Sequence, residues 1–231
     1  TALELAARRA GLYSIVPVID VRPRVWYNPE LKSRNFIVPG LIAVIMAIIA
    51  ALLTSLTVAR EWERGTMEQI ISTPVKPAEI IIGKLMPYFA IGIIDTVLAI
   101  VIVVFLFGVP LKGSFFLLLF ISCLFLFGGL SLGILISIVT KSQLASSQVA
   151  LITSYLPALL LSGFMFSILN MPVPLQIITR FIPARYFVSA IKGIFLKGNT
   201  AGMLLSEMGL LALFGALAFF IAIKKFKKRV T

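Results

Sequence analysis

EWERGTMEQIISTPVKP, residues 61–77, is a densely polar stretch that separates two long apolar runs. It holds three glutamates and two cationic residues, arranged around a short segment whose apolar residues have helical spacing. Nothing else in the chain resembles it. The chain is otherwise rich in apolar residues, so a charged, short helix between two apolar runs is unusual. We expect this helix to contact a partner in the aqueous phase.

The composition places the protein in a membrane. Hydrophobic residues make up 60% of the 231 residues and charged residues only 13%, which excludes a water-soluble globular domain. Several apolar runs reach the roughly 20 residues that a helix needs to cross about 30 Å of hydrocarbon. We therefore predict an all-α polytopic membrane protein with five transmembrane helices, at about 36–59, 80–107, 114–138, 149–169 and 203–223.

The residue inventory argues against an enzyme. Histidine is absent and the only cysteine, Cys123, lies in an apolar run, so neither a disulfide framework nor a metal cluster is expected. Gly83 and Lys84 do not form a phosphate loop, because Ala78 stands five positions before Gly83 and no Ser or Thr follows the lysine. The net charge of +12 is spread over loops and ends, which favours contact with anionic lipid headgroups over nucleic acid.

Two segments do not fit the pattern of spans. Residues 170–202 are too polar to span and too apolar for a free loop, so an outer re-entrant or interfacial hairpin is expected there. Residues 1–35 are half-polar and carry three prolines, which favours a short extended edge. The chain opens without methionine, so a fragment that lacks its true beginning is expected. The dense cluster of Lys and Arg at 224–229 places the C-terminus inside and residue 1 outside.

Within the polar stretch, Thr66 and Gln69 have the spacing of a capping box, preceded by Gly65. The helix that follows is expected to end after about two turns at Thr73 and Pro74. So short a helix is marginal alone and needs a partner surface, either in its own protein or in a second one. An ordinary solvated loop, with its charges placed to suit the helix dipole, explains the same residues equally well.

Three further features concern the interior of the membrane. Asp95 is the one formal charge deep in a span, where a charge is costly, so it has either a functional role or a hydrogen bond to a neighbouring hydroxyl. Small residues at four-residue spacing, such as Gly129 and Gly133, predict close helix packing, most simply within the subunit. Polar, proline and glycine residues interrupt the regular apolar pattern of the fourth span. This span is our candidate for lining a translocation path, through Ser154, Pro157, Ser162 and Gly163.

Several separated motifs resemble one family. REWERGTMEQIISTP at 60–74, VWYNPELKSRNFIVPG before it, FGVPLKGS at 107–114, LSGFMFSILNMPVPLQIITRFIPARYF at 161–187 and GIFLKGN at 193–199 look like the type-2 permeases of ATP-binding-cassette (ABC) transporters. These permeases are the membrane subunits of bacterial exporters and their drug-efflux relatives. The resemblance covers residues from about 20 to 225 in the right order, which makes it specific.

The resemblance implies a six-span parent, in which an additional N-terminal helix precedes an extracytoplasmic domain. Residues 1–35 would be the tail of that domain and 36–231 the transmembrane domain. It also implies that 65–74 is a coupling helix seated in a separate ATPase subunit, which would bind ATP and magnesium. The residues expected to set this contact, or the polar hinge beneath it, are Glu61, Glu63, Arg64, Gly65, Thr66, Glu68 and Gln69.

We therefore expect a permease subunit of an ABC exporter in the bacterial cytoplasmic (inner) membrane. It would pair with a second, identical or similar permease and move a hydrophobic or amphipathic compound outward. Two alternatives stay open from the residues alone. The first is a secondary transporter that uses Asp95 for ion coupling, and the second is a membrane scaffold or assembly protein that transports nothing.

Overall fold

The computed structural model describes residues 33–226. The extended edge expected in 1–35 lies outside this part, except for residues 33–35, which begin α2. Of the basic C-terminal cluster, Lys224 and Lys225 are described and the remainder lies outside. Within the described residues every regular element is helical, so the all-α fold is confirmed there.

Four helices are long and apolar enough to cross a membrane. They match four of the five predicted spans: α2 (Ser33–Glu63), α4 (Pro77–Val101) with the π-helical turn η1 (Ile102–Leu106), α5 (Phe115–Thr140) and α10 (Leu205–Lys225). Helix α4 begins with a proline at its first position, and the Glu79 carboxylate accepts from the backbone N–H of Lys76 at 2.8 Å. Helix α5 ends at Lys141, which adopts a left-handed conformation with φ 54°.

The predicted span at 149–169 is wrong in its position. The helix begins six residues earlier, with α6 (Gln143–Ala150), continues through the π-helical turn η2 (Leu151–Tyr155) and ends with α7 (Leu156–Leu160). This composite helix is not among the four long apolar helices of residues 33–226. The residues at its start are polar, and hydropathy does not detect a helix start that is capped from a distant part of the chain.

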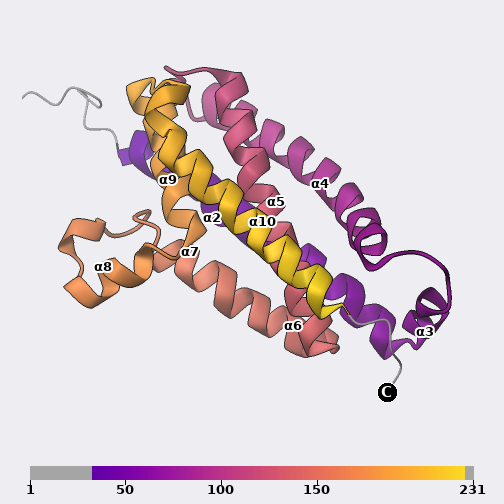
Figure 1. The fold of residues 1–231 in the computed structure, drawn as a ribbon. Helices are drawn as coiled ribbons and strands as arrows, with labels where there is room; N and C mark the ends of the chain where they lie inside the picture. Colours follow the sequence, from indigo (N-terminus) through magenta and orange to yellow (C-terminus); the bar gives the residue numbers. More distant parts are fainter. Residues whose placement is uncertain (1–32, 227–231) are drawn as a thin grey trace, which may run out of the picture. The chain divides into compact units, whose positions relative to one another are not determined.

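The segment between α7 and α10 enters the bundle. It contains η3 (Ile168–Asn170), α8 (Val173–Thr179), α9 (Pro183–Lys192), the π-helical turn η4 (Gly193–Lys197) and η5 (Ala201–Leu204). Helix α9 packs against α2, α5 and α10 (Figure 1). Its Phe187 is fully buried and stacks on Phe125, with ring centroids 4.1 Å apart. Helix α9 of the 170–202 segment is therefore buried in the bundle, whereas α8 keeps Val173 and Ile177 exposed.

Two contacts show the depth of α9. Its first residues share a cavity with Ala47, halfway along α2, whereas the Lys192 amine at its end lies 3.4 Å from the ring centroid of Phe36, near the start of α2. Helix α9 therefore runs antiparallel to α2, from the middle of the bundle to the end that carries the 107–114 turn. At that end, Gly113 N–H donates to the carbonyl of Ile194 at 3.0 Å.

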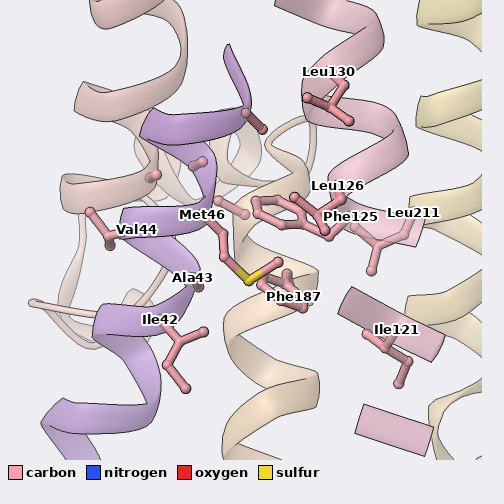
Figure 2. Close-up of a cluster of buried hydrophobic side chains, with 14 of the residues drawn as sticks. Ile42, Ala43, Val44, Met46, Ile121, Phe125, Leu126, Leu130, Phe187 and Leu211 are labelled. Atoms are coloured by element: carbon pink, nitrogen blue, oxygen red, sulfur yellow. The ribbon is translucent and has the colours of Figure 1, made fainter. Parts of the chain in front are cut away.

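The core is formed where α2, α5, α9 and α10 meet. Figure 2 shows Met46 of α2, Phe125 and Leu126 of α5, Phe187 of α9 and Leu211 of α10 around one apolar centre. The helices approach closely at glycines: a Cβ on Gly133 would lie 2.0 Å from the Thr54 hydroxyl oxygen. Gly129 faces Ala50 of α2 in the same way. The predicted role of these glycines in packing within the subunit is confirmed.

Candidate coupling end and membrane cavity

The polar stretch forms α3 (Thr66–Ile71), joined to α2 by Arg64 and Gly65. Gly65 has φ 72°, a left-handed conformation that favours glycine, and a Cβ added there would meet nothing within 4 Å. The predicted capping box is wrong, because the start of α3 has no side-chain cap and the Thr66 hydroxyl instead donates to the carbonyl of Glu61 at 3.5 Å. The helix ends before Pro74, as predicted.

Met67 and the partly buried Ile70 anchor α3 to the rest of the protein. Met67 is 1% exposed and belongs to the main core cluster. The opposite side of the corner is turned to solvent and contains exposed residues of both charges: Arg64, Gly65, Thr66, Glu68 and Gln69. A helix this short is held by its anchor, so its polar face is presented in a fixed orientation.

Glu61 and Glu63 are directed towards neighbouring helices. The Glu61 carboxylate forms a salt bridge with Lys84 of α4. The Glu63 carboxylate accepts from both the backbone N–H of Gln143, at 2.7 Å, and the Gln143 side-chain amide. These two glutamates therefore belong to the hinge beneath α3, tying the end of α2 to Lys84, seven residues into α4, and to the start of α6.

Further contacts close the same end of the bundle. The Ser137 hydroxyl of α5 accepts from the backbone N–H of Ala59 at 2.8 Å, in a buried position. The Lys141 amine lies 4.3 Å from the ring centroid of Trp62. Sequence reasoning missed Ser137, Lys141 and Gln143, since each meets the end of α2 from about 80 residues away and no local pattern marks it.

A cavity of about 240 Å³, partly open to the surface, lies between α2, α5, α10 and the composite helix, beside the turn that leads into α9. Ser154 and Pro157, two of the residues predicted to line a path, contribute to its wall. The remaining walls are apolar or uncharged and come from four other parts of the chain: Ala47 of α2, Phe125, Gly129 and Leu132 of α5, 181–184, and Phe214 of α10, with Thr153 beside Ser154.

The other predicted path residues lie elsewhere. Asp95 is half-buried on α4 and is not part of the cavity wall. Ser162 and Gly163 form the turn after α7, where Gly163 has φ 79° and its carbonyl accepts from the Lys192 amine at 3.1 Å. Burial lowers the pKa of that amine, which lies outside the four long spans, to about 8. No cluster of three or more potential metal ligands occurs among residues 33–226.

A bundle of long apolar helices with a charged, anchored helix at one end and an uncharged cavity between its helices has the features of a polytopic membrane protein. The chain belongs to the ABC-2 family: the family model described as ABC-2 family transporter protein matches residues 12–224. It is therefore a member of this transporter family with at least four helices that are long and apolar enough to cross a membrane.

Curated relatives agree with this assignment. The chain is 49% identical over 183 residues to the probable multidrug ABC transporter permease YbhS of Escherichia coli (strain K12). The aligned region covers 79% of this chain and 48% of the relative. It is 32% identical over 207 residues to the probable multidrug ABC transporter permease YbhR of the same organism, covering 90% and 56%. The inner membrane transport permease YhhJ is 29% identical over 217 residues, covering 93% and 57%. The chain thus spans about half the length of these relatives.

Proposed function

We propose that the protein is the permease subunit of an ABC exporter, which moves a hydrophobic or amphipathic, drug-like or lipid-like compound out of the cell. ATP and magnesium bind to separate ATPase subunits, and a second permease subunit, identical or similar, completes the path. The protein lies in the bacterial cytoplasmic membrane in contact with its lipids, with α3 and the C-terminus on the cytoplasmic side. It binds no nucleic acid.

The observation that carries the proposal is the geometry of α3. This helix is held by the buried side chain of Met67 and presents Glu68 and Gln69 to solvent. It follows a two-residue connection from the end of a 31-residue helix, so a force applied to α3 reaches α2 with little slack. A mixed-charge surface on a rigid support suits a protein partner that binds and releases during each cycle.

The cavity supplies the second half of the proposal. No charged side chain of residues 33–226 lines it, and aromatic rings from α5 and α10 form part of its wall, so it suits an uncharged or largely apolar group. The names of YbhS and YbhR as probable multidrug permeases support an exporter of such compounds. In the proposed cycle, closure of the ATPase subunits moves α3, and the bundle around the cavity opens towards the outside.

Co-purification tests the proposal. The complete natural protein, tagged and extracted in mild detergent, is expected to retain an ATPase subunit, and the double variant Glu68→Ala, Gln69→Ala is expected to lose it. Lys112→Ala serves as the matched control, because Lys112 is an exposed polar residue at the opposite end of the bundle. Retention of the ATPase by the double variant, or its loss from both variants, would contradict the assigned contact surface.

A further inference from the structure

The corner between α2 and α3 and the start of α6 are joined through one carboxylate. One oxygen of Glu63 accepts from the backbone N–H of Gln143, and the other accepts from the side-chain amide of the same residue. The Arg60 guanidinium Nε donates to the amide oxygen of Gln143 at 3.4 Å. Gln143 is therefore held by two residues from the last turn of α2.

These contacts act as a helix cap. Gln143 is the first residue of α6, and the first backbone N–H groups of a helix have no partner within it. Ser142, in the position that normally supplies a cap, makes no side-chain hydrogen bond to α6. The Glu63 carboxylate takes its place, and its negative charge suits the positive end of the helix dipole. The start of α6 thus depends on a residue 80 positions earlier in the chain.

Helix α6 leads directly to the cavity. It continues without a break through η2 and α7, an 18-residue path of about 27 Å, and contributes Thr153, Ser154 and Pro157 to the cavity wall. A π-helical turn followed by Pro157 marks the place where this composite helix bends most easily, since both interrupt the regular hydrogen bonds of an α-helix. Movement of its start would therefore reach the wall of the cavity.

We propose that Glu63 is a positioning residue that transmits the movement of α3 to the cavity by holding the start of α6, and that it touches neither the ATPase subunit nor the transported compound. Glu61 has the corresponding role towards α4, through Lys84. The proposal rests on the proposed function for the source of the movement. It separates the seven residues expected to set the ATPase contact into two groups. Arg64, Gly65, Thr66, Glu68 and Gln69 form an exposed contact surface, whereas the carboxylates of Glu61 and of the exposed Glu63 are engaged by α4 and α6.

The first experiment needs no ATPase. In the complete permease in lipid nanodiscs, Glu63→Ala is expected to accelerate amide hydrogen exchange at residues 143–146 by about fivefold, the effect of losing a typical helix cap. Glu63→Gln is expected to restore most of the protection, because its amide oxygen still accepts from the Gln143 N–H. Unchanged exchange in Glu63→Ala would overturn the proposal, whether or not an ATPase subunit binds.

The second experiment measures transmission in the complex with its ATPase. With Cys123 replaced by serine, spin labels at Leu160 and Leu217 report the distance between α7 and α10, both labels being placed at exposed positions. Glu63→Ala is expected to keep the ATPase bound and its basal hydrolysis unchanged, while the ATP-dependent change in this distance and the rate of transport fall about tenfold. Gln148→Ala, an exposed glutamine on the same helix, is the matched control and behaves as the wild type.

The outcomes distinguish the two proposals. Loss of the ATPase from Glu63→Ala would make Glu63 a contact residue and overturn its transmission role. A normal distance change in Glu63→Ala would show that α6 moves independently of this carboxylate. A wild-type protein that binds no ATPase would contradict the proposed function, whereas the exchange result would still decide whether Glu63 caps α6.

Discussion

Removal of the anchor of α3 is expected to release this helix without unfolding the bundle. Met67 is 1% exposed, and truncation of such a buried methionine to alanine costs about 2–5 kcal/mol. Helix α3 has only six residues and no stability of its own, so the loss acts on its docking. At the lower limit of about 2 kcal/mol, the undocked population of α3 rises roughly thirtyfold.

Hydrogen exchange measures this population directly. The backbone N–H of Ser72 bonds to the carbonyl of Glu68 at 3.1 Å in the last turn of α3, so its exchange in Met67→Ala is expected to accelerate about thirtyfold. Amides in the middle of α5 serve as an internal reference and remain protected. Met165→Ala is the matched control, because that methionine is 57% exposed. Unchanged exchange at Ser72, or equal acceleration in the control, would refute the assignment of Met67 as the anchor.

Three further predictions concern the bundle. Gly133→Ala is expected to lower the thermal unfolding midpoint, because overpacking costs about 1–3 kcal/mol. The control Gly209→Ala, where a Cβ meets nothing within 4 Å, is expected to leave the midpoint unchanged or higher. Equal midpoints for the two variants would contradict the close contact at Gly133. Asp95→Asn is expected to keep ATP-driven transport within about twofold of the wild type, because Asp95 lies outside the cavity wall. If transport by the wild type depended on an ion gradient and transport by this variant did not, ion coupling through Asp95 would be favoured instead. Burial lowers the pKa of Lys192 to about 8, below the roughly 10.4 of an unfolded lysine, so the unfolded chain binds more protons between these values and the contribution of Lys192 to stability rises as the pH increases through this range. Lys192→Met is expected to remove this part of the pH dependence of thermal unfolding, and an unchanged slope would refute it.

The long helices were predictable from composition alone. Four of the five predicted spans match helices of the structure to within a few residues at most ends, since an apolar run in lipid must satisfy its backbone hydrogen bonds internally. The fifth was misplaced at both ends: its start is capped by a distant glutamate, and its end is set by the turn at Ser162 and Gly163. Local hydropathy reports neither effect.

Part of the candidate site was likewise predictable from the sequence, and part depended on the tertiary structure. The exposed charges of the 61–77 stretch and the end of its short helix before Pro74 follow from local chemistry. The direction of each glutamate does not, because residues two positions apart on a helix lie on different faces, and packing decides what each face meets. Glu61 meets α4 and Glu63 meets α6, while Glu68 remains in solvent.

By itself, the composition determined a helical membrane protein with one charged corner, because apolar length and clustered charge are local properties. The resemblance of several separated motifs, and not these local properties, pointed to a permease family. Only the tertiary structure decided that α9 enters the core and that Glu63 caps a helix beginning 80 residues later. The cavity is likewise built from five separate parts of the chain. These arrangements depend on which helices pack together at close-contact glycines. The complementary shapes of whole helix surfaces, and not any local sequence pattern, determine that pairing.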